Sequence, residues 1–350
     1  MRTNIHLFLA IVIVFFAIDR VVADEVQQTN DRTLRGTITE ITPDEVKITN
    51  SAGAEQVVAA EDVKRIILDS EPAELKSARN NALNTQYNRV LSELDKMGDP
   101  PNDKFILGEV AFYRALAAGK LALSGEAGTL SDAGTIANKF VNSPTGQNSY
   151  HFYEGVELLG DLLMAVGKPD VAEKNFAKML ASQSKTVLLS GHTKVAESQL
   201  AQGKFDEALS SFDQAIAVDS TSPDAPRLKL FAGIGRANCL AELKRADEGI
   251  AFLQDLIKNQ DSSQNELFAR AYNALGNCYL KSGKDKEAVH AYLFTDVLFF
   301  QNAYDHGEAL YNLSLLWEKL NKTERARDAR NTLNTPRYQN TVWAKKVANN

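Results

Sequence analysis

The sequence predicts a mainly α fold, a right-handed superhelix of α-hairpins, preceded by a small antiparallel β module. Three observations lead to this prediction. A turn motif recurs at intervals of 36 to 41 residues through the C-terminal half of the chain. An apolar stripe at helical spacing accompanies the copies of this motif. Nearer the N-terminus, a separate segment alternates β-branched and polar residues, which is typical of a sheet.

The first 23 residues have the layout of a signal peptide. Arg2 precedes the apolar run from Leu7 to Ile18, and Val21-Val22-Ala23 offers small residues before Asp24. Because the run of 12 residues is shorter than the ~20 that a spanning helix needs, we expect a cleaved segment, with a retained anchor as the alternative. We therefore expect export to the periplasm, the cell envelope or the medium.

The charge of the remaining chain excludes one class of partner. Without the signal segment the chain holds 37 basic and 44 acidic residues, a net charge of −7. Such an acidic chain lacks the electrostatic footprint of a nucleic-acid binder. We expect no nucleic-acid partner, and membrane contact only through the signal segment before its cleavage.

Residues 24–69 predict the β module. Four alternating runs, Thr33–Ile41, Glu45–Thr49, Glu55–Val58 and Val63–Leu68, favour a four-stranded antiparallel meander. Their pattern resembles small SH3-like or Sm-like barrels. Because so short a segment buries little surface by itself, we expect it to pack on the first helices or on a partner.

Residues 70–142 predict degenerate helical pairs. Glu71-Pro72-Ala73 is typical of a helix start, with proline in the first turn. The helical pattern stops near Gly98-Asp99-Pro100-Pro101, resumes from Phe105 to Leu123, and returns from Leu130 to Val141. These pairs lead into the repeats.

Residues 143–334 contain five copies of the repeat, and residues 335–350 follow as a C-terminal tail. Each first helix is expected to end at a residue in the left-handed conformation, which glycine and then asparagine adopt most readily, and some copies have a less suitable residue there. An acidic residue follows near the start of the second helix, where it opposes the helix dipole. A small residue precedes each turn by seven positions, and a large apolar residue follows the small one by 16 in the first four copies. The small residues are Gly160, Ala196, Ala237, Gly276 and Ser314, and the large ones are Phe176, Phe212, Leu253 and Tyr292, with Arg330 in the fifth copy.

These residues resemble the tetratricopeptide repeat (TPR) family. Leu275-Gly276, Tyr279, Gly283 and Tyr292 match its pattern in the fourth copy, and Leu159-Gly160 with Gly167 in the first. The third copy departs from it at Lys244 and Gly249. The resemblance implies stacked two-helix units, and a generic helical bundle without true repeats is the alternative. The fold class is thus mainly α, with TPR-like hairpins.

The two cysteines occupy equivalent positions in neighbouring repeats. Cys239 and Cys278 each follow the small residue by two positions. The axes of packed helices lie about 8 to 10 Å apart, whereas a disulfide needs α-carbons within about 7 Å. We predict two buried free thiols.

Catalytic and cofactor motifs are absent from the sequence. It contains no HExxH, GxSxG or GxGxxG pattern and no phosphate-binding loop, and its histidines lack metal-ligand spacing. We therefore expect no enzyme activity, no cofactor and no metal site.

The remaining candidate site is the concave surface, which the first helix of each repeat lines. In the fourth repeat Arg270, Asn273, Asn277 and Lys281 share one stripe beside the core stripe. Shifting by the repeat intervals adds residues from the third and fifth repeats. The predicted partner-binding residues are Phe231, Ile234, Asn238, Arg270, Asn273, Asn277, Lys281 and Tyr311.

The resemblance implies one way in which this surface works. Peptide-binding TPR domains hold a ligand main chain or its terminal carboxylate with asparagines and basic residues, the role open here to Asn238, Asn273, Asn277 and Arg270. The alternative is an ordinary solvated face. At the earlier repeats, Glu157 and its acidic neighbours favour basic surfaces.

We predict a non-enzymatic exported scaffold that binds a protein or peptide in the concave groove. An extracytoplasmic receptor for a polysaccharide or peptide is the alternative, favoured if Phe231 and Tyr311 line a pocket. An enzyme without recognisable motifs ranks third, and clustered carboxylates with shifted pKa values in a pocket would revive it. The sequence does not specify the partner, the oligomeric state or the role of the β module.

Overall fold

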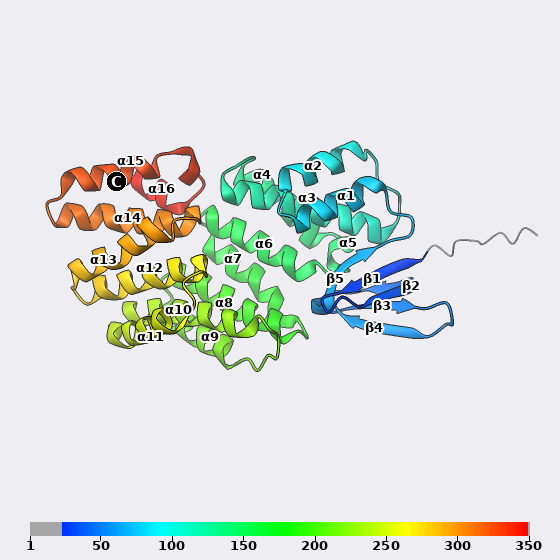
Figure 1. Cartoon of the computed structure of the whole chain (residues 1–350), viewed down its shortest axis with the longest axis horizontal. Helices are drawn as coiled ribbons and strands as arrows, with labels where there is room; N and C mark the ends of the chain where they lie inside the picture. The colour runs from blue at the N-terminus through cyan, green and yellow to red at the C-terminus, as the bar shows by residue number, and fades with distance from the viewer. Residues whose placement is uncertain (1–22, 349–350) are drawn as a thin grey trace, which may run out of the picture.

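A five-stranded antiparallel sheet stands at one end of a long array of α-helices (Figure 1). The computed structural model describes residues 23–348. The mainly α fold with a small antiparallel β module in front of TPR-like hairpins is confirmed. The predicted signal peptide, residues 1–23, lies outside the described residues except for Ala23.

The strands and 3₁₀ helices are β1 (Asp24–Gln28), β2 (Thr33–Ile41), β3 (Glu45–Thr49), β4 (Glu55–Ala59), η1 (Ala60–Asp62), β5 (Val63–Ile67), η2 (Ala177–Ala181) and η3 (Pro336–Tyr338). The first helices are α1 (Ala73–Leu83), α2 (Tyr87–Lys96), α3 (Lys104–Ser124), α4 (Leu130–Asn142) and α5 (Pro144–Gln147). The repeats comprise α6 (Phe152–Ala165), α7 (Pro169–Phe176), α8 (Lys185–Ala201), α9 (Phe205–Ala217), α10 (Ala225–Glu242), α11 (Ala246–Asn259), α12 (Asn265–Lys281), α13 (Asp285–Leu298), α14 (Ala303–Lys319) and α15 (Thr323–Leu333), and α16 (Val342–Ala348) follows.

The sheet order is β4-β3-β2-β1-β5, so the predicted four-stranded meander is wrong in its topology. The strand missing from the prediction, β1, lies between β2 and β5 and pairs with both in the antiparallel sense. Its sequence contains a single large apolar residue, Val26, which is fully buried. One such residue leaves no alternation for pattern analysis to detect. The Asp24 carboxylate accepts the amides of Ile38 at 2.8 Å and Asp69 at 3.0 Å.

The sheet is joined to the array as well as to the first helices. The Asp44 carboxylate accepts a hydrogen bond from the Ser182 hydroxyl at 2.9 Å and from the Gln183 amide at 3.0 Å. The Ser184 hydroxyl donates to Glu61 at 2.5 Å. The β module thus packs on the segment between η2 and α8, which Figure 1 places beside the sheet.

A buried ion cluster ties the first helical pairs together. Arg79 on α1 is 1 % exposed and donates to both oxygens of Glu71, at 3.0 and 2.9 Å. It also donates to Glu109 on α3, at 3.1 and 3.3 Å. Burial opposes the charge of Arg79, but Glu109 and Glu71 outweigh it and raise the pKa of the guanidinium. Such a cluster stays stable only while all three charges remain together.

Five hairpins form the repeat array, with α6, α8, α10, α12 and α14 as the first helices. Their turns are stopped by residues in the left-handed region, namely Gly167, Gly203, Lys244, Gly283 and Asn321. No side chain caps the second helices of these hairpins. Asp170 and Asp206 lie in the first turns of their helices, where their charges oppose the helix dipole without accepting a capping hydrogen bond.

In the first and fourth repeats, the small residue of the first helix packs against the large apolar residue of the second helix, as the repeat pattern predicts. A β-carbon built at Gly160 would lie 2.1 Å from the ring of Phe176, and one at Gly276 would lie 2.7 Å from the ring of Tyr292. In the fifth repeat, Arg330 instead forms an ion pair with Glu318 at 2.6 Å. The last hairpin therefore presents a polar outer side, as a terminal repeat requires.

The prediction of two buried free thiols is confirmed. Cys278 lies against the backbone carbonyl of Ala237 at 3.6 Å. Burial raises the pKa of both thiols to about 12. A β-carbon built at Gly249 would approach the Cys278 sulfur to 2.9 Å, which accounts for the departure from the repeat pattern at this position.

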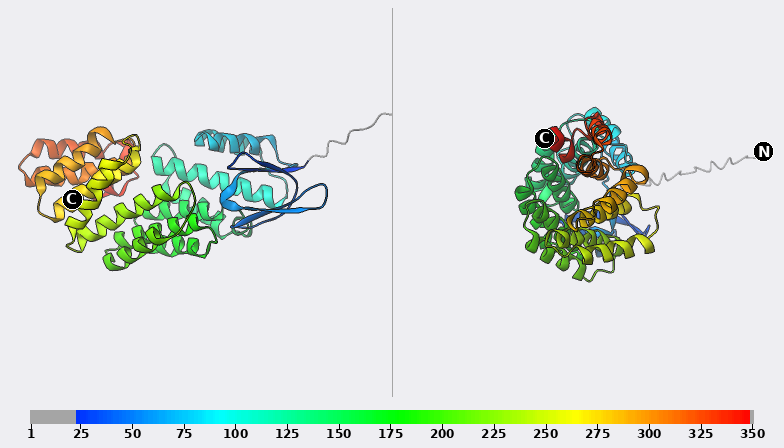
Figure 2. Two further views of the ribbon diagram at one scale, coloured as in Figure 1. Left: turned by 60° about the horizontal axis from the view of Figure 1, so that its bottom comes forward. Right: turned by 90° about the vertical axis from the view of Figure 1, so that its left-hand side faces the viewer.

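The C-terminal segment, predicted as a tail, contains η3 and α16 and packs on α14. It also contacts α3 and α6. Asn340 donates to the Ala122 carbonyl at 2.8 Å, and Lys345 donates to the Ala165 carbonyl at 3.1 Å. Figure 2 shows the helices arranged around the long axis of the molecule. Within residues 23–348, no helix is both long and apolar enough to cross a bilayer.

Candidate partner-binding surface

Successive first helices lie side by side and form the inner surface of the array. α10 packs against both α8 and α12, and α12 against α14. Cross-helix hydrogen bonds occur at repeat-equivalent positions, so the side chain of Asn277 donates to that of Asn238 at 3.0 Å. Lys281 donates to Glu242 at 2.5 Å one turn further along. The predicted contact residues Asn238, Asn277 and Lys281 thus lie on one surface, where their side chains hydrogen-bond with neighbours on the adjacent helix.

Two of the predicted contact residues are buried instead of lying open on this surface. Ile234 is 4 % exposed and packs in the core shared by α10, α11 and α12. Asn273 is 2 % exposed, and its amide donates to the Asp305 carbonyl at 2.8 Å and to Glu308 at 3.3 Å. Asn273 is thus buried by its contacts with α14, and Ile234 by its packing against α11 and α12.

The two predicted aromatic residues are partly covered by neighbouring side chains. The centroid of the Phe231 ring lies 4.7 Å from the guanidinium carbon of Arg227 and 5.1 Å from that of Arg270. Tyr311 packs on Trp343 of α16, with 5.6 Å between ring centroids. A cavity of about 360 Å³ lies between α9, α10 and α11, and its lining includes neither Phe231 nor Tyr311.

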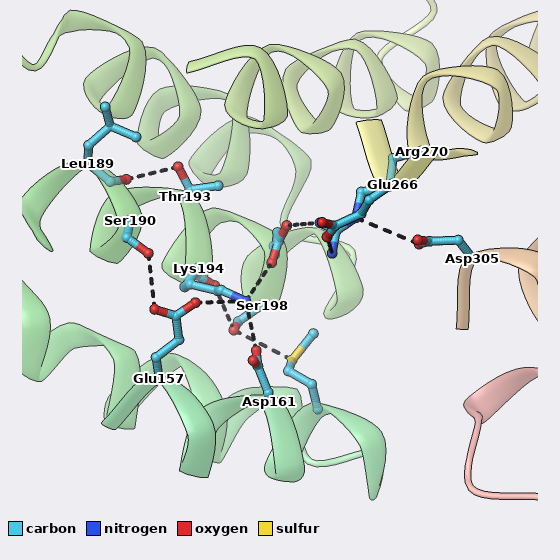
Figure 3. A network of polar contacts seen from close by, with 12 residues as sticks. Glu157, Asp161, Leu189, Ser190, Thr193, Lys194, Ser198, Glu266, Arg270 and Asp305 are labelled. Atoms are coloured by element: carbon cyan, nitrogen blue, oxygen red, sulfur yellow. Dashed lines mark hydrogen bonds and ion pairs between the residues drawn. The ribbon is translucent and has the colours of Figure 1, made fainter. Parts of the chain in front are cut away.

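An ion network links the first helices across this surface (Figure 3). On its N-terminal side, Lys194 of α8 points toward α6, where it pairs with Asp161 at 2.8 Å and Glu157 at 3.5 Å. It also lies 3.9 Å from Glu197. Burial opposes the charge of Lys194, but these carboxylates outweigh it and raise the pKa of the ammonium group.

Arg270 of α12 carries the network to the C-terminal side. It lies 3.4 Å from Glu197 of α8, 3.1 Å from Glu266 and 3.7 Å from Asp305 of α14. The contact with Glu197 spans two repeats, so Arg270 crosses over α10 above the ring of Phe231. Figure 3 shows Arg270 beside Glu266 with Asp305 facing it.

The carboxyl groups on α14 are poorly compensated. Burial raises the pKa of Asp305 to about 6, against the opposing effect of Arg270. Burial, with repulsion from Asp305, raises the pKa of Glu308 to about 7, and the Asn273 amide, Arg270 and Lys346 only partly offset this. Both groups therefore change charge near neutral pH.

Two acceptor atoms in this region are buried without a hydrogen-bond partner among the described residues: the side-chain oxygen Oδ1 of Asn273 and Oδ2 of Asp305. The Nε of Arg270 also lacks one, because its 3.7 Å distance from Asp305 is too long for a hydrogen bond. Buried acceptors without donors are rare in folded proteins, since each costs about 1–3 kcal/mol. These groups therefore lower the stability of this part of the array.

Lys194, Glu266 and Asp305 were absent from the sequence prediction. Asp305 aligns with Leu267 in the preceding repeat, so a carboxyl group at a core position was the available signal. Lys194 adjoins the predicted stripe, where charge is ordinary, and nothing marks it in the sequence. Within residues 23–348, no group of three or more histidine, cysteine or acidic side chains is placed to hold a metal ion.

The comparisons with known proteins agree with this geometry. Models of the tetratricopeptide repeat match residues 194–266 and 269–293. No curated protein matches the chain.

The chain is similar to many solved structures, including the following three. The first is a Rap protein complexed with competence and sporulation factor, with TM-score 0.59, 14 % identity and 78 % of each chain covered. The second is NprR in complex with its cognate peptide NprX, with TM-score 0.54, 16 % identity and coverage of 79 % of this chain and 82 % of that one. The third is the apo form of RapI, with TM-score 0.58, 8 % identity and coverage of 79 % and 97 %. At these identities the similarity shows the fold alone. Residues 194–266 and 269–293 therefore carry tetratricopeptide repeats, and the hairpins from α6 to α15 share a TPR-like arrangement.

Proposed function

We propose that this chain is an exported, non-enzymatic scaffold that binds an extended peptide segment of a partner on the inner surface of its TPR array. The observation that carries the proposal is the row of partly exposed polar side chains that successive first helices place on one inner surface, namely Asn238, Asn277 and Arg270. A peptide offers backbone amides, carbonyl groups and side-chain donors at regular spacing, so it can hydrogen-bond with such a row.

Similarity of fold supports the same proposal. The Rap and NprR structures are described as complexes with a factor and with a cognate peptide. Both share the overall fold with this chain over most of its length. Ligand recognition by a superhelical array follows from its geometry, because the first helices present a continuous concave surface.

The receptor alternative has less support from the aromatic side chains. The Phe231 ring contacts the guanidinium groups of Arg227 and Arg270, and Tyr311 lies against Trp343. Both residues are only partly exposed, and neither lines the cavity between α9, α10 and α11. Asp305 and Glu308 have raised pKa values, but neither lines the cavity between α9, α10 and α11, so this cavity gives the enzyme alternative no support.

Export is proposed from the signal layout of residues 1–23. The strand β1 starts at Asp24, and its carboxylate is already used within the sheet. Cleavage after Ala23 therefore leaves the sheet complete. Mass spectrometry of the protein recovered from its native compartment should show Asp24 as the first residue, and an intact Met1 on that protein would refute cleavage.

Peptide binding is tested by equilibrium dialysis of the purified protein against a degenerate octapeptide library, with retained peptides measured by mass spectrometry. Asn277→Trp fills the inner surface with a bulky ring, and we expect it to reduce retention about tenfold or more. Glu207→Trp places the same ring on the exposed first turn of α9 and serves as the control.

The wild type should retain a subset of the library, and both variants should keep the wild-type circular dichroism spectrum. No retention by the wild type would refute peptide binding. Equal retention by the wild type and Asn277→Trp would place the site elsewhere on the molecule.

A further inference from the structure

We propose that the inner surface selects positively charged partner segments, with arginine or lysine side chains received between α8, α12 and α14. This inference rests on the proposed peptide-binding function and names the chemistry of its ligand. It differs from the carboxylate-holding role that the family resemblance implies for Arg270.

Carboxylates outnumber cations on the inner surface. The ion network contains six carboxylates and two cations. Arg227 and Lys346 approach its edges, at Glu266 and Glu308, and carboxylates still outnumber cations. The six carboxylates are Glu157, Asp161, Glu197, Glu266, Asp305 and Glu308. A surface with this excess attracts cationic segments and repels anionic ones.

Two buried side-chain oxygens support the same ligand chemistry, independently of the charge balance. Asn273 and Asp305 are 2 % and 3 % exposed, and each has a side-chain oxygen without a donor among the described residues. Both oxygens are acceptors, so a donor group that displaces Arg270 from its position beside Asp305 can hydrogen-bond with them. A guanidinium group provides five N–H donors and a positive charge together.

Arg270 occupies the centre of this region. Its contacts with Glu197 and Asp305, at 3.4 and 3.7 Å, are long for ion pairs, and its Nε makes no hydrogen bond. Arg270 therefore compensates the carboxylates incompletely while crossing the surface above Phe231. A cation from the partner would share these carboxylates and compete with Arg270 for them.

The raised pKa values of Asp305 and Glu308, about 6 and about 7, have the same origin. Arg270, Glu266 and Glu197 face Asp305, while Asp305, Asn273, Arg270 and Lys346 face Glu308. A bound cation favours the ionised form of both carboxyl groups, so binding releases protons. Affinity should therefore rise as the pH increases from 5.5 to 8.

The test uses the dialysis experiment, now read for the composition of the retained octapeptides. We expect arginine and lysine to be enriched at least about threefold over aspartate and glutamate among them. One retained peptide is then synthesised with a fluorescent label, and its affinity is measured by anisotropy at pH 8 and pH 5.5.

Two variants separate the opposing models of the site. Glu197→Gln with Glu266→Gln should weaken binding of the labelled peptide about tenfold, because two carboxylates beside Arg270 lose their charges. Arg270→Gln should strengthen it about threefold, since the competing internal cation is removed. The control, Asp206→Asn with Glu207→Gln, removes two exposed carboxylates on α9 and should leave the affinity unchanged.

The outcomes distinguish this inference from the proposed function. Retained peptides that are neutral or acidic, or weaker binding by Arg270→Gln, would overturn selection of cations while leaving peptide binding intact. Absence of any retained peptide would refute both.

Discussion

The two halves of the ion network differ in how closely carboxylates surround their central cation, Lys194 in one half and Arg270 in the other. On the side of α6 and α8, Lys194 has a 17 % exposed side chain and a 2.8 Å contact with Asp161. On the side of α12 and α14, Arg270 has a 33 % exposed side chain and lies 3.7 Å from Asp305. The first arrangement satisfies its ammonium group, whereas the second leaves donors and acceptors unpaired.

This difference separates structure from binding within a single surface. Removing a compensated buried charge lowers stability strongly, because its partner charges are then left buried without a counterion. An incompletely paired group lowers stability and is available to a ligand. We infer that Lys194 joins the first two repeats, while the region around Arg270, Asn273 and Asp305 receives the partner.

The largest expected effect comes from removing the compensated cation. Lys194→Met should lower the free energy of unfolding by about 3 kcal/mol, since it leaves the carboxylates on α6 and α8 unpaired. Urea unfolding followed by circular dichroism measures the change. Lys284→Met, at an ion pair with the exposed Asp247 on the outside of the array, should change stability by less than about 0.5 kcal/mol. Equal effects of the two variants would remove the distinction between the two halves.

Repeat-equivalent polar residues sharpen the comparison. Asn273 bonds across to α14, whereas Thr193, at the equivalent position of the second repeat, donates to Leu189 of its own helix at 2.9 Å. Asn273→Leu should cost about 2 kcal/mol, because Glu308 loses a donor and the contact between repeats is broken. Thr193→Val should cost less than about 1 kcal/mol. Urea unfolding of both variants tests this order, and a larger loss for Thr193→Val would contradict it.

The sequence predicted the repeats well because their rules are local. Glycine at a left-handed turn and a small residue opposite an aromatic ring, as at Gly167 and Gly160, leave signals at fixed spacing. The β1 strand left no such signal, because it is held by pairing with β2 and β5 and not by an apolar pattern of its own.

The site residues were harder to predict, because burial on the inner surface depends on how closely successive helices approach. Asn273 and Asn277 share one predicted stripe, but α14 covers the first and leaves the second partly exposed. The contact of Arg270 with Glu197 joins residues 73 positions apart, across an intervening repeat. Sequence periodicity describes one helix at a time and does not fix such distances.

The smallest expected effect is the dependence of stability on pH. Asp305 and Glu308 have pKa values of about 6 and about 7 in the folded chain, above their ordinary values of 3.8 and 4.5. The folded state therefore binds more protons than the unfolded state between about pH 4 and pH 7, and their contribution to stability increases as the pH falls through this range. We expect the wild type to gain about 1 kcal/mol from pH 8 to pH 5.5 relative to Glu308→Gln, in urea unfolding at both pH values. Glu207→Gln, on the outer side, should titrate as the wild type does. A wild type and Glu308→Gln with the same pH dependence would show that the C-terminal half is as well compensated as the half around Lys194.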